Sequence, residues 1–345
     1  MSQVGLHVAI VGATGEVGRQ IIKVLERSQI PISSLRLLAS KKSAGKKFLF
    51  RGTPRIVEQL NENAFKGTHL AFFSAGGTIS LKYVQAALKE GAVVIDNTSA
   101  FRMNQDVSLV VPEVNAHTIT ATTKLIANPN CSTIQLVVAL KPLLETYGLE
   151  SVNVATYQAI SGAGTKALLE YDRELKDTAY RPRILPAATD QKFYQIAHNI
   201  IPQVDVFTES GYTKEELKMI NETQKILNDL TLKVNATCVR VPVRYGHSLA
   251  ITVKLKTEIK SREEILELFG RNSDTILHDH IKEQIYPMPV YLAHHDGVYV
   301  GRIRKDLFCD RTVHLWVVTD NILKGAALNS VQIADYMHSK GLLGD

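Results

Sequence analysis

The chain has 345 residues, which suits two domains better than one, since single domains usually span about 100–200 residues. A content of 45% hydrophobic and 21% charged residues is that of an ordinary globular protein with enough apolar side chains for a core. The net charge of +6 is small for this length, and the basic residues are dispersed. This argues against a nucleic-acid-binding surface and is compatible with small anionic ligands.

The three cysteines, at positions 131, 238 and 309, form neither a CxxC pair nor a zinc-binding pattern. Their odd number argues against a disulfide framework and predicts a reducing, cytoplasmic setting without a metal site. No apolar segment at the N-terminus is long enough for a signal peptide, and no apolar run reaches the roughly 18 residues of a membrane span. We therefore expect a cytoplasmic protein that binds neither membranes nor nucleic acids.

A short apolar run, residues 6–11, leads into the glycine-rich stretch GATGEVG at 12–18, and an amphipathic helical pattern follows. Strand, glycine loop and helix in this order are typical of a dinucleotide-binding turn, where the pyrophosphate lies on the helix N-terminus. The spacing is GxxGxxG and not the standard GxGxxG, so a glycine-rich turn without a ligand is the alternative. The expected cofactor contacts in this loop are Gly12, Thr14, Gly15, Glu16 and Val17.

The second predicted strand, residues 35–39, runs into a loop of hydroxyls and lysines that begins at Ser40. An NAD-specific site usually places an acidic residue here to bind the ribose 2′-hydroxyl, and none is present. The loop suits a 2′-phosphate and therefore NADP, with Ser40, Lys41 and Ser43 as candidate ligands. A solvated basic loop is the alternative.

Short apolar strands continue to alternate with helices through residues 70–73, 81–90 and 93–96, as in a parallel doubly wound sheet. The loop at 97–103 follows a strand's carboxyl end, where such sheets bind ligands. Arg102 in this loop is either a surface charge or a ligand for an anion.

Cys131 lies in the stretch NPNCST, between an apolar run at 125–127 and a helical run at 134–144. A cysteine at such a junction meets the free N–H groups and the positive end of the helix dipole, which stabilise a nucleophilic thiolate. Ser132 or Thr133 would cap the helix. The alternative is that Cys131 is a small buried hydrophobic residue.

The second half of the chain predicts a strand at 152–160, the turn SGAG at 161–164, a helix at 166–177 and an irregular segment at 178–206 that could form an interface. A helix at 213–229 begins with a capping box, Thr213 and Glu216. Glu215 and Lys218 share one face of it, where a solvated ion pair is the ordinary interpretation.

Strands follow at 236–243 and 248–255, joined by Arg244–His247, and a final helix at 324–340 could return to the first domain. Arg240 lies in a highly apolar strand, where burial is costly without an anion or an acidic partner. A lone histidine such as His247 is more often structural than catalytic.

Together these segments resemble the aspartate-semialdehyde dehydrogenase family, the NADP-dependent enzymes of bacterial type, over essentially the full chain. The resemblance implies a Rossmann-type α/β domain at 1–131, completed by the C-terminal helix at 322–345, and an α+β mixed-sheet domain for catalysis and dimerisation at 132–321. The matching motifs are GATGEVG at 12–18, NTSAFRM at 97–103, NPNCST at 128–133, YQAISGAG at 157–164, CVRVPVRYGHS at 238–248 and DNILKGAA at 320–327.

The resemblance also implies a reaction and an assembly. NADPH would reduce L-aspartyl 4-phosphate to L-aspartate 4-semialdehyde through a cysteine thioester and release inorganic phosphate. The product would serve the biosynthesis of lysine, methionine, threonine, isoleucine and diaminopimelate. The enzyme would be a homodimer that requires no metal.

Carried over residue by residue, the resemblance makes Cys131 the nucleophile and His247 the acid–base on the hemiacetal oxygen. Asn130 and Gln158 would position the thiol and the acyl group. The substrate would be bound by Arg240 at the α-carboxylate, by Glu215 at the α-ammonium, and by Lys218 and Arg102 at the phosphate. Ser161 and Gly162 would lie against the nicotinamide, and Asn321 near its amide.

Two other interpretations compete with this one. A related acyl-phosphate reductase, of the N-acetylglutamyl-phosphate or glyceraldehyde-3-phosphate type, would share the architecture and the thiolate. An acylated amine, however, would leave Glu215 without a cation. A non-catalytic NADP-binding regulator would be expected to lose Cys131 or His247, and this chain has both.

Overall fold

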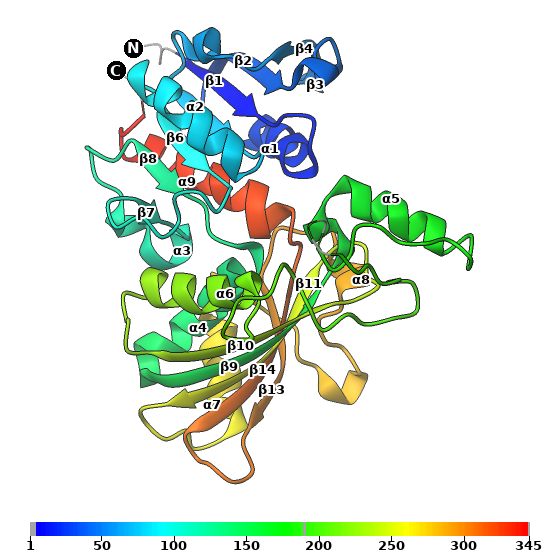
Figure 1. Ribbon diagram of the computed structural model, residues 1–345. Helices are drawn as coiled ribbons and strands as arrows, with labels where there is room; N and C mark the ends of the chain where they lie inside the picture. Colours follow the sequence, from blue (N-terminus) through cyan, green and yellow to red (C-terminus); the bar gives the residue numbers. More distant parts are fainter. Residues whose placement is uncertain (1–4, 188, 190, 344–345) are drawn as a thin grey trace. The chain divides into compact units, whose positions relative to one another are not determined.

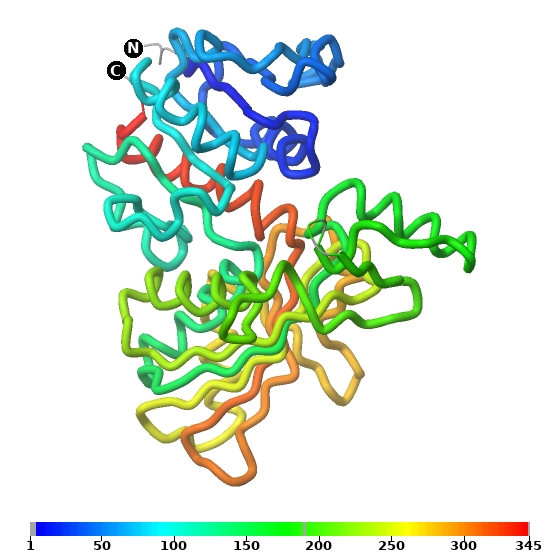
Figure 2. The backbone as a smooth tube through the Cα atoms, in the orientation of Figure 1, coloured from blue at the N-terminus to red at the C-terminus, as the bar shows by residue number. Residues whose placement is uncertain are grey.

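The computed structural model describes residues 5–187, 189 and 191–343 of the chain (Figures 1 and 2). The chain divides into two compact units, Met1–Asn130 with Ala326–Asp345, and Cys131–Gly325. The unit boundaries lie close to the predicted domain boundaries at 131/132 and 321/322. Which unit binds cofactor and which carries out catalysis stays a prediction at this point.

The first unit is built on one sheet with the strand order β3-β4-β2-β1-β5-β6-β8-β7. Every described pairing is parallel except the β3–β4 hairpin. The central strands β5 and β6 are buried along their whole length, as expected of apolar strands covered on both faces. The strands are β1 (Leu6–Val11), β2 (Ile32–Ala39), β3 (Lys47–Phe50), β4 (Thr53–Gln59), β5 (Leu70–Phe73), β6 (Val93–Asp96), β7 (Ser108–Leu109) and β8 (Leu125–Ala127).

The helices of this unit include the C-terminal helix α9, which contacts α1, α3 and β6. Polar side chains hold it there: Ser330 donates to Asn97 Oδ1 at 2.6 Å, and Asn329 Nδ2 donates to Asn128 Oδ1 at 2.7 Å. The end of the chain thus braces the loops after β6 and β8. The helices are α1 (Glu16–Arg27), α2 (Gly77–Lys89), α3 (Pro112–Asn115), α9 (Leu328–Ser339) and the 3₁₀ turns Lys41–Ser43, Glu62–Phe65 and Ala116–Thr118.

The second unit contains a mixed sheet with the order β10-β9-β11-β14-β13-β12. β10 and β11 follow one another along the chain, yet β9 lies between them, parallel to β10 and antiparallel to β11. The carboxyl ends of β9 and β10 and the first residues of β11 therefore lie at the same end of the strands. The strands are β9 (Leu149–Gln158), β10 (Lys233–Arg240), β11 (His247–Leu255), β12 (Ile276–Leu277), β13 (Tyr299–Lys305) and β14 (Thr312–Thr319).

Helices cover one face of this sheet (Figure 1): α4 contacts β9, β11 and β14, and α6 contacts β10 and α4. Strand residues alternate accordingly, with Val152 and Val154 buried and Asn153 exposed. We call the other face, which includes Asn153, Thr237, Thr252 and Trp316, the open face. The helices are α4 (Cys131–Tyr147), α5 (Thr165–Glu174), α6 (Lys214–Ile226), α7 (Arg262–Arg271), α8 (Pro289–Leu292), the 3₁₀ turns Ile160–Ala163 and Ile281–Glu283, and the π-helix Leu323–Ala327.

The described residues of 178–206 form no helix and no multi-residue strand, as the irregular pattern predicted. Two buried carboxylates of α5 hold this segment by accepting backbone N–H groups. Glu170 binds the amides of residues 183 and 184, and Glu174 binds those of 196 and 197, all at 2.8–3.0 Å. Sequence patterns did not reveal this role, because the paired groups are backbone amides.

Two local predictions about helix starts had different outcomes. The capping box of α6 is confirmed, with Glu216 N donating to Thr213 Oγ1 and Thr213 N donating to Glu216 Oε2. The cap proposed for α4 is wrong. That helix begins at Cys131, so Ser132 and Thr133 lie inside its first turn.

Candidate active site

Cys131 is the first residue of α4, at the positive end of the helix dipole, and is partly exposed. A Cβ built on Gly325 would lie 2.9 Å from the Cys131 Cβ. The backbone at residue 325 therefore packs directly against the cysteine, which is possible because glycine has no side chain. The pKa values of the other two thiols are shifted in opposite directions. Burial raises the pKa of Cys238, and hydrogen bonds from Thr312 and Arg311 lower the pKa of Cys309.

His247 opens β11 and is completely buried. Its Nδ1 accepts a hydrogen bond of 2.9 Å from the backbone N–H of Ala159, at the end of β9. Burial and the neighbouring positive charge of Arg240 hold the pKa of His247 well below its ordinary value. The imidazole is therefore neutral at physiological pH.

Arg240 closes β10 and is 4% exposed. Its Nη1 donates to the carbonyl oxygen of Ala159 at 2.7 Å. Burial lowers the pKa of the guanidinium, and the negative charges of Glu215 and Cys131 oppose that shift. The sequence argument predicted an anion or an acidic partner for a buried Arg240, and the negative charge of Glu215 acts on this guanidinium.

Gly162 packs closely against both of these side chains. A Cβ on this residue would lie 3.0 Å from Arg240 Nη1 and 3.3 Å from His247 Nε2. The guanidinium and the imidazole therefore both approach the backbone at residue 162, where any side chain would be crowded.

Glu215 lies in the first turn of α6 and is 5% exposed. It accepts hydrogen bonds from Gln158 Nε2 at 3.2 Å and from Lys218 Nζ at 3.1 Å. Lys218 also donates to Asp205 at 2.9 Å. Burial alone would lower the pKa of Lys218, but Glu215 and Asp205 outweigh it and raise the pKa. The solvated ion pair predicted as the ordinary interpretation is thus a half-buried cluster of charges.

Asn321 and Ser161 form a polar clamp in this unit. Asn321 Oδ1 accepts from the backbone N–H of Gly246 at 2.9 Å, and Asn321 Nδ2 donates to Ser161 Oγ at 3.0 Å. The clamp ties the turn after β9 to the residue before His247. The predicted contacts of Ser161 and Asn321 with a nicotinamide stay predictions.

Arg102 belongs to the first unit and is 7% exposed. Its Nε donates to the carbonyl oxygen of Asn128 and its Nη2 to that of Asn97, both at 2.9 Å. Asn128 and Asn130, both buried, lead directly to Cys131 along the chain. The guanidinium is thus anchored to the segment that precedes the candidate nucleophile.

The glycine loop of the first unit has the geometry of a dinucleotide-binding turn. Gly12 has a φ of +86°, and a Cβ on Gly18 would collide with the Gly12 oxygen, so α1 packs directly on the end of β1. Gly15 is the N-cap of α1 and provides no side-chain cap. Thr14, Glu16 and Val17 belong to the same stretch of sequence. In the strand order β2-β1-β5, the neighbours of β1 lie on opposite sides of it, which makes the end of β1 a topological switch point.

The loop after β2 is adjacent to this turn, because the amide of Gly12 donates to the carbonyl of Leu38 at 2.8 Å. Ser40 and Lys41 are exposed and Ser43 is half-buried. These groups and the N-terminus of α1 fit a nucleotide that carries phosphates. The groups that suit phosphates are exposed hydroxyls and ammonium groups, which lie beside a helix N-terminus that no side chain of its N-cap residue caps.

Three residues of the cluster were not identified from the sequence: Ala159, Asp205 and Gly325. Ala159 contributes only backbone atoms, so its side chain carries no signal. Asp205 lies in the irregular segment, and Gly325 packs on Cys131 through its lack of a side chain. The motifs YQAISGAG and DNILKGAA contain Ala159 and Gly325, but only as unassigned positions.

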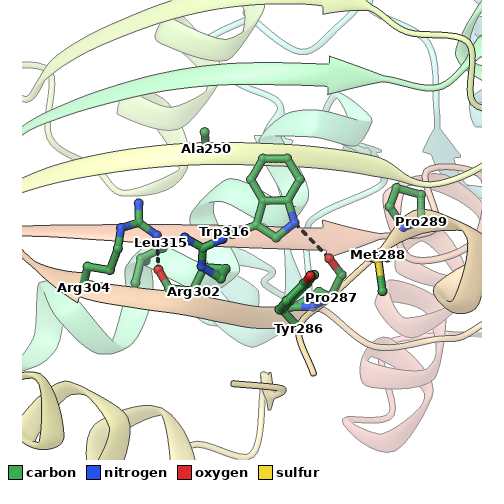
Figure 3. A pocket seen from close by; sticks show the side chains of 9 residues that line it. All are labelled: Ala250, Tyr286, Pro287, Met288, Pro289, Arg302, Arg304, Leu315 and Trp316. Atoms are coloured by element: carbon green, nitrogen blue, oxygen red, sulfur yellow. Dashed lines mark hydrogen bonds between the residues drawn. The ribbon is translucent and has the colours of Figure 1, made fainter. Parts of the chain in front are cut away.

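A separate pocket of about 330 Å³ lies on the open face of the second sheet (Figure 3). Trp316 lines it and donates through Nε1 to the carbonyl of Pro287 at 2.9 Å, and Arg302 stacks on Tyr286. None of the predicted site residues lines this pocket. It is therefore distinct from the cluster around Arg240 and His247.

Within the described residues, no group of three or more His, Cys, Asp or Glu side chains is arranged to hold a metal ion. None of the helices in the described part of the chain has the length and apolar character to cross a membrane.

Comparison with known proteins identifies the family. Residues 7–122 match the model "Semialdehyde dehydrogenase, NAD binding domain", and residues 140–324 match "Semialdehyde dehydrogenase, dimerisation domain". The chain is 48% identical to aspartate-semialdehyde dehydrogenase of Bacillus subtilis over 98% of this chain and 99% of that protein. It is 50% identical to the enzyme of Aquifex aeolicus over 98% and 100%.

A solved structure of aspartate semialdehyde dehydrogenase II from Vibrio cholerae, complexed with ASA, superimposes with a TM-score of 0.91 at 43% identity, covering 98% of this chain and 99% of that one. The predicted fold, a nicotinamide-dinucleotide domain of Rossmann type followed by a mixed-sheet domain, is confirmed. The chain belongs to the aspartate-semialdehyde dehydrogenase family.

Proposed function

We propose that this protein is an enzyme that reduces L-aspartyl 4-phosphate to L-aspartate 4-semialdehyde with NADPH and releases inorganic phosphate. The observation that carries this proposal is the position of Cys131 at the start of α4, in one compact unit with the buried Arg240, Glu215 and His247. The relatives that share about half of its residues are named for this activity.

The covalent steps take place on Cys131. The thiolate attacks the acyl phosphate, the carbon–oxygen bond to phosphate breaks, and a thioester forms. NADPH, when bound, supplies the hydride that reduces this thioester to a thiohemiacetal. Collapse of the thiohemiacetal releases the aldehyde and regenerates the thiolate. His247 acts as the acid–base that handles the proton of the hemiacetal oxygen, and Asn130 and Gln158 position the thiol and the acyl group.

The charges of the second unit suit a free amino acid. Arg240, with its guanidinium fork, binds the α-carboxylate, and Glu215 binds the α-ammonium. Lys218 and Arg102 bind the phosphate. Glu215 supports the choice of substrate, because an N-acylated amine would offer this buried carboxylate no positive charge.

The cofactor of this proposal is NADP. Gly12, Thr14, Gly15, Glu16 and Val17 form the pyrophosphate turn. Ser40, Lys41 and Ser43 bind the 2′-phosphate, Ser161 and Gly162 lie against the nicotinamide, and Asn321 lies near its amide. The absence of an acidic side chain in residues 40–46 supports NADP over NAD.

The assembly of this proposal is a homodimer formed through the second unit, whose residues 140–324 match a dimerisation domain. The loop between β13 and β14 supports it, because Leu307 is 89% and Phe308 is 95% exposed there. The hollow around Trp316 on the open face (Figure 3) offers a further surface for a partner. Residence in the cytoplasm stays a prediction that rests on the cysteine pattern.

The experiment that tests the function is an assay of NADPH formation from NADP with L-aspartate 4-semialdehyde, with and without inorganic phosphate. N-acetylglutamate semialdehyde and glyceraldehyde 3-phosphate serve as competing substrates. We expect phosphate-dependent turnover with aspartate semialdehyde at least about a hundredfold above the other two, given two charged contacts to the amino-acid end. Preference for either rival aldehyde, or no turnover at all, would contradict the proposal.

A further inference from the structure

The buried guanidinium of Arg102 is held by two loops of the first unit. Its Nε donates to the carbonyl oxygen of Asn128 and its Nη2 to that of Asn97, both at 2.9 Å. Asn97 follows β6 and Asn128 follows β8, and these two strands are parallel neighbours in the sheet. A guanidinium is planar and its N–H groups are rigidly spaced, so two carbonyls that bind different nitrogens fix its orientation. The relative position of the two loops therefore sets the direction in which Arg102 faces.

Both loops are also held by consecutive residues of the C-terminal helix α9. Ser330 Oγ donates to Asn97 Oδ1 at 2.6 Å, and Asn329 Nδ2 donates to Asn128 Oδ1 at 2.7 Å. Adjacent residues of a helix point about 100° apart, which lets this pair reach two different loops. The two asparagines whose carbonyls hold the guanidinium are thus the same two whose side chains α9 binds.

The contacts between α9 and the two loops are buried. Asn329 and Ser330 are both 0% exposed, and Asn128 is 1% exposed. Asn329 Nδ2 has a second contact, with the carbonyl oxygen of Val110 at 3.0 Å. Water cannot readily replace a hydrogen bond that is lost in such surroundings, so its loss leaves a polar group unpaired or moves the loop.

The direction of the Ser330 hydrogen bond follows from the other contacts of its partner. Asn97 Nδ2 donates to the carbonyl oxygen of Phe73 at 3.2 Å, so Asn97 Oδ1 faces Ser330 and needs a donor. The Ser330 hydroxyl also lies 2.9 Å from the carbonyl oxygen of Ala326, one turn earlier in the chain. A hydroxyl has one proton, and we assign it to the shorter contact with Asn97. Removal of this hydroxyl therefore removes one donor to the loop after β6.

We propose that Asn329 and Ser330 are positioning residues for Arg102 and, through it, for the inorganic phosphate of the reaction. They fix the side chains of Asn128 and Asn97 and so hold the two carbonyls that orient the guanidinium. This inference rests on the proposed function, which assigns the phosphate to Arg102. It gives the C-terminal helix a role in substrate binding, in addition to completing the first unit.

The test measures NADPH formation by the full-length enzyme from L-aspartate 4-semialdehyde, with each substrate varied in turn. Ser330→Ala removes only a hydroxyl and introduces a good helix former, so the variant should fold. We expect the KM for phosphate to rise by about three- to tenfold, the usual effect of one lost hydrogen bond. The KM for the aldehyde, and kcat at saturating phosphate, should stay within about twofold of wild type.

Two more variants frame this result. Asn329→Ala removes the contact with the other loop and should also raise chiefly the KM for phosphate. Ser339→Ala is the matched control, because it is the same substitution in α9 at a hydroxyl that donates to the carbonyl of Tyr336 in the same helix. Its kinetic constants should equal those of wild type. A rise in the phosphate KM as large as that of Ser330→Ala would overturn the proposal, since any loss from α9 would then have the same effect.

A double variant separates positioning of Arg102 from general support of the fold. If Ser330 acts through Arg102, Ser330→Ala should not raise the phosphate KM further once the guanidinium is absent. The variant that combines Ser330→Ala with Arg102→Leu should therefore match Arg102→Leu alone. Effects that multiply would show that Ser330 acts by another route and would overturn the proposal. An equal rise of both KM values in Ser330→Ala, together with a lower kcat, would also overturn it.

These outcomes distinguish the inference from the proposed function. If wild type shows no phosphate-dependent turnover of aspartate semialdehyde, or if Arg102→Leu leaves the phosphate KM unchanged, the assignment of phosphate to Arg102 fails and the inference fails with it. If Arg102→Leu raises that KM while Ser330→Ala and Asn329→Ala leave it unchanged, the proposed function stands and only the role of α9 is wrong.

Discussion

The glycine loop of the first unit and the charged cluster of the second are built on opposite principles. The loop at 12–18 is continuous in sequence and offers backbone N–H groups beside exposed hydroxyls and lysines. The cluster draws together residues from α4, α6, β9, β10 and β11, and its charges are buried or half-buried and act on one another. A ligand of the loop meets groups that act almost independently. A change in the cluster, in contrast, leaves a buried partner without its counter-charge.

The largest effect on activity is expected for Cys131, the residue that forms the covalent intermediate. Cys131→Ala should abolish turnover, and Cys131→Ser should leave only a trace, because a serine hydroxyl hardly ionises near neutral pH. Steady-state assays measure this. Cys309→Ser is the matched control and should retain activity, although its lowered pKa makes Cys309 a second target for alkylating reagents. Inactivation that tracks modification of Cys309 would contradict the assignment.

The next largest effects distinguish the roles of the two buried arginines, of which one lies in each unit. Arg240→Lys keeps the charge but loses the fork that holds the α-carboxylate, and should raise the KM for the semialdehyde and lower kcat. Arg102→Leu should raise chiefly the KM for phosphate. Loss of a charged hydrogen-bonding partner corresponds to about 2–3 kcal/mol, or roughly thirty- to two-hundredfold in kcat/KM.

Both variants are assayed with each substrate varied in turn. An effect of Arg240→Lys on phosphate alone, or of Arg102→Leu on the aldehyde alone, would reverse the proposed orientation of the substrate.

The cofactor loop should respond more mildly, because its cations are exposed and act independently. Wild type should prefer NADP over NAD by a factor of about ten or more in kcat/KM, since charged contacts to the 2′-phosphate contribute roughly 1.5–3 kcal/mol. Lys41→Ala should reduce that ratio while leaving kcat with NAD unchanged. Equal kcat/KM for the two cofactors in wild type would remove the basis for choosing NADP.

Gly162→Ala probes the cluster without removing any charge. The added Cβ would lie 3.0 Å from Arg240 Nη1 and 3.3 Å from His247 Nε2, so the neighbours must shift by a few tenths of an ångström. We expect a loss of about tenfold in kcat/KM with little change in the thermal unfolding temperature, because a small shift moves Arg240 and His247 while the backbone at residue 162 is not strained. Ala163→Gly is a control on the same turn. If Gly162→Ala were as active as wild type, the close packing of Arg240 and His247 at residue 162 would not matter for activity.

The smallest effect is on stability. The pKa of His247 is lowered in the folded protein, so the unfolded chain binds the proton more readily below its ordinary pKa of about 6.5. Stability is therefore complete above pH 6.5 and falls as the pH drops, by at most about 1.4 kcal/mol per pH unit from this residue. Urea unfolding at pH 7.5 and 5.5 should show a smaller acid loss in His247→Gln than in wild type. Identical losses would mean that His247 is not held neutral.

Local patterns in the sequence determined the first unit and the helix starts. The strand–glycine loop–helix unit, the basic loop after β2 and the capping box of α6 are all decided by residues within a few positions of one another. The placement of Cys131 at a helix start belongs to the same class, although Ser132 and Thr133, which were proposed as caps, lie inside the helix. Local steric and hydrogen-bonding preferences are sufficient for such features.

Tertiary structure decided the cluster. Gln158 meets Glu215 across 57 positions of the chain, and Ala159 meets His247 across 88. These contacts exist because β9 is inserted between β10 and β11, a topology that no spacing in the sequence specifies. The family resemblance suggested roles for several of these side chains, but it was silent on the Ala159 peptide. A backbone hydrogen bond carries no side-chain signature, so only the folded chain could reveal that the Ala159 amide donates to His247 Nδ1.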